Sequence, residues 1–195
     1  MKTRTQTLLL LKLCLGALLS MTFADIGAQT PTPALRTNQQ HPASIAGKPT
    51  SFYLNHNAII RDAKLYYEGK LTPSDETRTF AILDSVLTCN TEIRPFYFFI
   101  LNQIMKTADG ALSEYITTVC TRYFSEYPCE FIQRQADPIY EINPRRWAEF
   151  IAFDLYSPEA LKKYSGGLKS AACHTQTLDT FLKDLHRIVT EINEH

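Results

Sequence analysis

The stretch PFYFFILNQIM, residues 95–105, decides the fold because its side chains are apolar on nearly every side. Its 11 residues are fewer than the roughly 20 that a membrane-spanning helix requires. We therefore predict that it forms the central buried helix of a domain. A buried strand would have a similar local pattern. The helix is favoured because Lys106 continues the register as far as Asp109-Gly110, where a helix can end, and because the neighbouring segments are helical in pattern.

Apolar residues recur at helical spacing on the C-terminal side of this stretch. A helix is predicted to begin at Asp109-Gly110 and to end at Pro128, because proline interrupts helical hydrogen bonding. Asn143-Pro144 and Ser157-Pro158 each combine a capping side chain with a proline, which is typical of a helix N-terminus. Gly166-Gly167 predicts a break in the chain's helical pattern. The final helix has the clearest apolar stripe, formed by Leu178, Phe181, Leu182, Leu185, Ile188, Val189 and Ile192.

Helical signals continue on the N-terminal side. Gly69 is predicted to end a first helix, and residues 72–76 are predicted to start the next with a cap, an early proline and acidic side chains. Strand signals are nearly absent. The sequence therefore predicts an all-α fold, with a single domain of about seven or eight short antiparallel helices in an irregular bundle or a helical-hairpin array. In the helix that residues 72–76 are predicted to start, the apolar face consists of Phe80, Leu83, Val86 and Leu87.

The N-terminus has the pattern of a secretory signal peptide. A basic start precedes an apolar stretch from Leu8 to Leu19, and small residues follow at positions 24–28. We expect cleavage after Ala28, which removes residues 1–28 and makes the chain secreted or periplasmic. A retained membrane anchor is the alternative.

The processed chain would consist of a linker, residues 29–50, and a helical domain, residues 51–195. The linker is rich in Pro, Thr, Gln and Ala, so it is predicted to be flexible because it cannot bury enough apolar surface to offset the entropy of ordering. Cleavage removes three basic residues and one acidic residue from the chain's 20 of each, which leaves 17 basic and 19 acidic groups. This balance does not predict nucleic acid or an anionic membrane as a partner. No integral membrane span is expected after cleavage.

Four cysteines would remain in the processed chain: Cys89, Cys120, Cys129 and Cys173. An even number in an exported protein suggests two disulfides, for which three pairings are possible. We favour Cys120 with Cys129, which could meet across the turn at Pro128, and Cys89 with Cys173. Buried free thiols are the alternative. No two of these cysteines have the C-x-x-C spacing of a metal or redox site.

The common catalytic motifs are missing: the sequence has no His-Glu-x-x-His zinc helix, Gly-x-Ser-x-Gly elbow, phosphate-binding glycine loop or EF-hand. Neither a cofactor nor a metal site is predicted. Carboxylates could still hydrolyse a glycan or peptide if at least two of Glu114, Glu149, Asp154 and Glu159 met in a deep pocket. Glu149 and Asp154 are five positions apart and point to different sides of a helix, which favours solvated charges instead.

Aromatic and arginine side chains are the most suggestive feature for binding, because Tyr, Trp and Arg are enriched at interaction hot spots. The surplus aromatic residues are Tyr97, Tyr123, Tyr127, Tyr140, Trp147 and Tyr156. From these and the nearby arginines we take as candidate binding residues Arg94, Tyr97, Tyr140, Arg145, Arg146 and Trp147. A place in the core, with the polar tips at its edge, is the alternative explanation.

The leading hypothesis is therefore a non-catalytic helical module that binds another protein of the cell envelope or the secreted fraction. One alternative is an envelope hydrolase that acts through buried carboxylates. Another is a carrier that holds an apolar small ligand among the side chains of residues 96–105, which requires a cavity.

Overall fold

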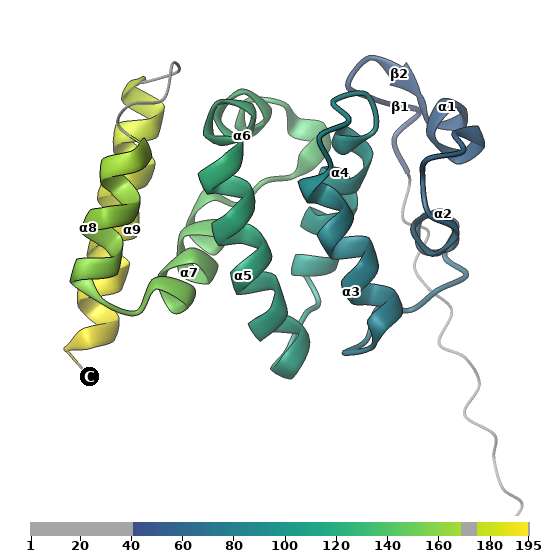
Figure 1. The fold of residues 1–195 in the computed structure, drawn as a ribbon. Coiled ribbons are helices and arrows are strands. Elements are labelled where there is room, and N and C mark those ends of the chain that lie inside the picture. The colour runs from purple at the N-terminus through teal and green to yellow at the C-terminus, as the bar shows by residue number, and fades with distance from the viewer. Residues whose placement is uncertain (1–40, 169–174, 195) are drawn as a thin grey trace, which may run out of the picture. The chain divides into compact units, whose positions relative to one another are not determined.

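The computed structural model describes residues 41–168 and 175–194. Over these ranges the chain is all-α, as predicted, with nine α-helices, two short 3₁₀ helices and one two-stranded hairpin (Figure 1). The predicted signal peptide lies outside the described residues. None of the described helices combines the length and the apolar character that a membrane span requires.

The helices follow one another with short connections. In chain order they are α1 (Thr50–Asn55), α2 (Arg61–Tyr67), α3 (Thr77–Asp84), α4 (Arg94–Met105), α5 (Gly110–Glu126), α6 (Pro128–Gln135), α7 (Pro144–Leu155), α8 (Pro158–Leu168) and α9 (Gln176–Asn193). The 3₁₀ helix η1 (Ser85–Leu87) precedes α4, and η2 (Pro138–Tyr140) precedes α7.

A small hairpin precedes α1, within the range that the sequence assigned to a linker. Strand β1 (Ser44–Ile45) pairs antiparallel with β2 (Lys48–Pro49). Ala46 and Gly47, in the turn, both have positive φ, which glycine adopts without strain. The Ile45 side chain is fully buried, and Tyr53 on α1 donates a hydrogen bond to the Ile45 carbonyl at 2.9 Å. These residues therefore contribute to the core, although no long apolar run marks them in the sequence.

Helix α4 is the buried central helix that residues 95–105 predicted. All of its residues except Gln103 are buried. It packs against α2, α3, β1 and both 3₁₀ helices, so protein surrounds it. Stacked rings also link α4 to two further helices: the Phe96 ring lies 5.2 Å from that of Tyr53 on α1, and the Phe98 ring lies 4.8 Å from that of Tyr123 on α5.

Two predicted helix starts are confirmed by their capping bonds. At α7, the backbone N–H of Arg146 donates to Oδ1 of Asn143 at 3.1 Å. At α8, the backbone N–H of Ala160 donates to Oγ of Ser157, also at 3.1 Å. Each bond satisfies one of the N–H groups that have no partner within the helix.

The start predicted at residues 72–76 lies slightly too early. Helix α3 begins at Thr77, and Glu76 at its N-cap makes no side-chain capping bond. The backbone N–H of Ser74 instead donates to Oγ1 of Thr79 at 3.0 Å, which holds the preceding turn against the first turn of the helix.

The break predicted at Gly166-Gly167 is wrong, because α8 continues through both glycines to Leu168. A glycine costs only about 1 kcal/mol relative to alanine inside a helix. The buried residues Leu161, Ser165 and Leu168 recur at helical spacing, and α8 packs on α9. This packing stabilises the helical course more than the two glycines weaken it.

Helix α7 packs between α5 and α9. Its buried side chains include Trp147, whose ring lies 4.8 Å from the Phe131 ring of α6. The Phe131 ring in turn lies 5.1 Å from the Phe181 ring of α9. This chain of aromatic contacts fixes one side of α7 in the core, so that its opposite side faces outward.

Candidate functional site

The six candidate binding residues do not form one surface. Four of them lie in the core: Arg94 is 3% exposed, Tyr97 2%, Tyr140 1% and Trp147 0%. Arg145 and Arg146, on α7, are the two exposed ones. The structure thus places most of the aromatic surplus where a core role accounts for it.

The polar tips of two of these buried rings, Tyr97 and Trp147, have partners within the fold. The backbone N–H of Ile60 donates to the Tyr97 hydroxyl at 3.0 Å. Nε1 of Trp147 donates to Oδ1 of Asn102 at 2.9 Å, and Nδ2 of Asn102 donates to the Phe98 carbonyl at 2.8 Å. Satisfied buried polar groups of this kind orient the rings and join α4 to α7.

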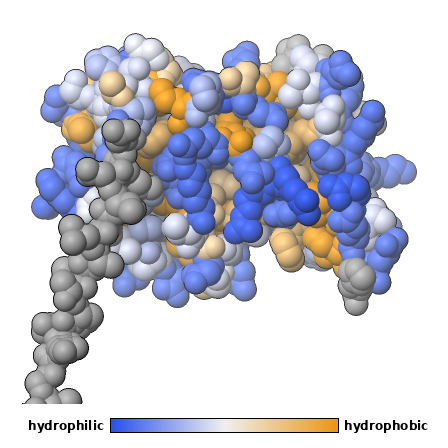
Figure 2. Space-filling model, turned by 180° about the vertical axis from the view of Figure 1, so that it is seen from behind, coloured by the Kyte–Doolittle hydropathy of each residue, from blue (hydrophilic) through white to orange (hydrophobic). Residues whose placement is uncertain are grey.

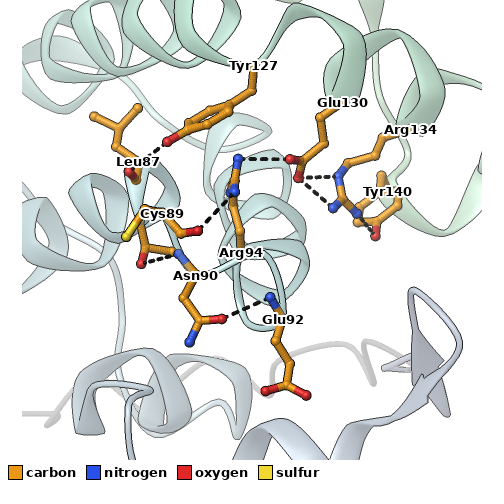
Figure 3. Close-up of polar contacts among 10 residues, drawn as sticks. Leu87, Cys89, Asn90, Glu92, Arg94, Tyr127, Glu130, Arg134 and Tyr140 are labelled. Carbon is orange, nitrogen blue, oxygen red and sulfur yellow. Dashed lines mark hydrogen bonds and ion pairs between the residues drawn. The ribbon is translucent and has the colours of Figure 1, made fainter.

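Three charged side chains, Arg94, Glu130 and Arg134, form a cluster with the neutral Tyr140 between α4, α6 and η2 (Figure 3). Nη1 of Arg94 lies 3.0 Å from Oε2 of Glu130, and Nη2 of Arg134 lies 2.6 Å from Oε1 of the same carboxylate. Arg134 also donates to the Tyr140 hydroxyl. One carboxylate is therefore shared by two guanidinium groups.

The same cluster extends to the loop that follows η1. The Arg94 guanidinium lies 3.8 Å from the centroid of the Tyr127 ring, and its Nη2 donates to the Cys89 carbonyl at 3.5 Å. The Tyr127 hydroxyl donates to the Leu87 carbonyl at 3.2 Å (Figure 3). Arg94 on α4 thus contacts the loop after η1, Tyr127 and Glu130 on α6. These contacts indicate a structural role for Arg94.

Burial also changes the acidity of the hydroxyl groups near this cluster. It raises the pKa of Tyr140 to about 12, although the nearby Arg134 charge opposes the shift. Burial raises the pKa of Tyr123 as well. Sequence reasoning selected Arg94 and Tyr140 but missed Glu130 and Arg134, whose one available signal was their i, i+4 spacing on a helix.

A second set of side chains lies on the outward face of α7 and at its C-terminal cap, and we call it the α7 stripe: Arg145, Arg146, Glu149, Phe153 and Tyr156. At about 100° per residue the four positions that lie within α7 fall within roughly a third of the helix circumference. Tyr156 follows the helix as its C-cap residue, with a φ of 29°. The large hydrophobic side chains of Phe153 and Tyr156 are 62% and 71% exposed. On the opposite face, Trp147 and Ile151 are fully buried.

Ion pairs and ring contacts order the N-terminal half of the stripe. Nε of Arg145 donates to Oε1 of Glu149 at 3.1 Å, and Nη1 of Arg146 lies 4.0 Å from Oε2 of the same carboxylate. The Arg146 guanidinium lies 4.6 Å from the centroid of the Phe150 ring. Sequence reasoning selected both arginines, but it missed Phe153, which shares their face at helical spacing.

The stripe is one feature of a surface that is otherwise mostly polar. Seen from behind, hydrophilic residues cover most of the described surface, and hydrophobic residues gather in separate areas between them (Figure 2). Among the described residues, Phe153 and Tyr156 are the large hydrophobic side chains that are exposed.

The four carboxylates of the hydrolase hypothesis have different surroundings. Glu114 on α5 and Glu159 on α8 are exposed. Glu149 pairs with the two arginines of the stripe, and Asp154 accepts a hydrogen bond from Oγ1 of Thr118 at 3.1 Å. None of these contacts joins one of the four carboxylates to another.

The favoured disulfide pairings are wrong, because Cys89 and Cys120 are both free thiols. Cys120 lies on α5 six residues before the helix ends at Glu126. At 1.5 Å per residue it is about 9 Å from that end along the axis, which is beyond the reach of a disulfide to the following turn. Cys129 is not a free thiol, and Cys173 lies outside the described residues.

No protein-family model matches the sequence, no curated protein matches it, and no solved structure matches the fold. We therefore infer function from the side chains of this chain and their surroundings.

Proposed function

We propose that the chain is an exported, non-catalytic helical module that binds another protein through the α7 stripe. The observation that carries this proposal is the exposure of Phe153, on the same helix face as Arg145 and Arg146, and of Tyr156, the residue that directly follows α7. Aromatic and arginine side chains contribute most of the binding energy in many protein interfaces, because they combine a large contact area with a polar group.

The stripe is suited to binding because its backbone is already ordered. Its helix has a capping bond at Asn143 and a buried face against α5 and α9. A partner therefore does not have to offset the cost of folding this segment. Complete burial of one large apolar side chain contributes about 1.5–3 kcal/mol, so Phe153 and Tyr156 together could anchor a contact of moderate affinity.

The dimensions of the stripe describe the contact that a partner must make. Arg145 and Phe153 are eight positions apart on α7, which is about 12 Å along a helix, and Tyr156 follows at the C-terminal end. The cationic end at Arg145 favours a partner with an acidic group, and the aromatic end favours an apolar groove. Export rests on the N-terminal sequence pattern and places this partner in the envelope or outside the cell.

Capture of a partner by the processed chain tests this proposal. The double variant F153S/Y156S should retain at least tenfold less of the partner than the unaltered chain does, because both apolar anchors are gone. The matched control is R187A/E191A, which removes an exposed ion pair on α9 and should capture the partner normally. Circular dichroism should show the same helix content for all three proteins.

Two outcomes would contradict the proposal. One is equal capture by the F153S/Y156S variant and the unaltered chain. The other is that the unaltered chain retains no protein from the compartment in which it resides.

The two alternative functions have less support from specific contacts. The carboxylates of the hydrolase hypothesis already have separate surroundings, with Glu149 paired to arginines and Asp154 bonded to Thr118. The carrier hypothesis requires space around α4, where Phe96 and Phe98 already contact other rings of the protein.

A further inference from the structure

A pocket lies where the end of α4 meets the beginning of α7. Its volume is about 230 Å³, and the side chains around it include Lys106, Glu141, Asn143 and Arg146. Trp147 also lines it. A cavity of this size suits a molecule of roughly ten non-hydrogen atoms or fewer, since drug-sized ligands occupy sites of about 300 Å³ or more.

Two cations reach the pocket from segments that are 40 positions apart in the sequence, Lys106 after α4 and Arg146 in α7. Nζ of Lys106 donates to Oε1 of Gln103 at 3.0 Å, and burial lowers the pKa of Lys106. Because this ammonium group has lost part of its hydration, a negatively charged partner beside it is favoured.

Arg146 has only a loose contact with its carboxylate neighbour, at 4.0 Å from Glu149. Its side chain is 44% exposed. The Arg146 guanidinium can thus pair with a second carboxylate without breaking a short ion pair. Guanidinium groups bind carboxylates well because their N–H donors match both oxygens.

Glu141 would compete with an incoming anion for the Lys106 ammonium group. Its carboxylate pairs with Lys106 at the pocket and also accepts from Nε2 of Gln103 at 3.4 Å. Its backbone has φ of 47°, the left-handed conformation, which is uncommon for a residue with a Cβ. Strained positions of this kind occur preferentially at functional sites.

We propose that this pocket binds a small carboxylate, which displaces Glu141 from Lys106 and is held between Lys106 and Arg146. The Glu141 side chain is 56% exposed, so it can rotate into solvent when the ligand enters. This inference does not depend on the protein partner of the α7 stripe.

Trp147 fluorescence can report ligand binding, because Trp147 is the one tryptophan of the chain and lines the pocket. Succinate added to the unaltered chain should change the tryptophan fluorescence to a saturable limit and raise the thermal midpoint of unfolding. Succinamide, which has the same size but no charge, should produce neither change. Sodium chloride at matched ionic strength serves as the second control.

Three variants distinguish binding in this pocket from unspecific effects of ions on the protein. K106Q and R146Q should each weaken succinate binding at least tenfold, because each removes one cation that holds the ligand. E141Q should tighten binding several-fold, because it removes the competing carboxylate. K162Q, on the exposed face of α8, should bind succinate like the unaltered chain.

The proposal is overturned if succinate changes neither the fluorescence nor the thermal midpoint in both the unaltered chain and E141Q. It is also overturned if succinamide acts like succinate, or if E141Q binds no more tightly. The capture of a protein partner by the stripe is a separate measurement, so either result can fail without the other.

Discussion

Glu130 holds two arginines inside the fold, and the consequence of losing it can be estimated. Its carboxylate contacts Arg94 and Arg134, whose side chains are 4% and 13% exposed. Glu130→Gln should destabilise the protein by about 3 kcal/mol, because both guanidinium groups remain buried without a counter-charge. Urea unfolding followed by circular dichroism measures this loss.

The control for this prediction is an ion pair of the same kind at the surface. In the Arg187–Glu191 pair the side chains are 49% and 54% exposed. Glu191→Gln should therefore change the free energy of unfolding by less than about 1 kcal/mol. Equal effects of the two substitutions would show that the buried cluster does not stabilise the fold.

Tyr140 makes the stability of the fold depend on pH in the alkaline range. Its pKa is about 12 in the folded protein, because of burial, and 10.0 is the ordinary value. Between these two values the unfolded chain binds fewer protons than the folded one, so stability is complete below pH 10 and decreases as the pH rises towards 12. Over this range, one such group lowers the free energy of unfolding by about 1.4 kcal/mol per pH unit.

Tyr140→Phe separates this contribution from those of the other buried tyrosines. The variant should be less stable than the unaltered protein at pH 8 by about 1 kcal/mol, because it loses the bond from Arg134. Its stability should then fall less steeply between pH 10 and pH 12. Urea midpoints at several pH values measure both effects, and parallel curves for the two proteins would refute the assignment.

At the scale of elements, the capping bond of α7 determines how firmly the stripe is presented. Oδ1 of Asn143 accepts a hydrogen bond from the backbone N–H of Arg146. Asn143→Ala should destabilise the protein by about 1 kcal/mol, measured by urea unfolding. Asn57→Ala, at an exposed position outside the helices, should have no measurable effect, and an equal loss at both positions would mean that the cap is unimportant.

Helix starts with a local chemical cause could be predicted from the sequence. Asn143-Pro144 and Ser157-Pro158 mark real starts, because the capping bond forms within one turn. Gly166-Gly167 misled the prediction, because the contact of α8 with α9 decides that stretch and is not visible locally. The same limit applies to Cys120, whose distance from Pro128 depends on how far α5 extends.

At the scale of the whole molecule, the all-α fold followed from apolar periodicity, and the buried central helix followed from a stretch that is apolar on nearly every side. The candidate site followed only in part. Arg145 and Arg146 are at the surface, whereas Trp147, their neighbour in sequence, is fully buried. Composition identified suitable residue types, but the direction of each side chain depends on which face of α7 packs against α5 and α9.

Binding of a partner protein by the α7 stripe is the central claim, and site-specific photocross-linking in cells that produce the chain tests it most directly. A photoreactive amino acid replaces Phe153 in one variant, Tyr156 in a second, and Arg187 on the exposed face of α9 in a third. We predict a discrete cross-linked product at positions 153 and 156 and none at position 187. No product at 153 and 156, or the same product at all three positions, would contradict the claim.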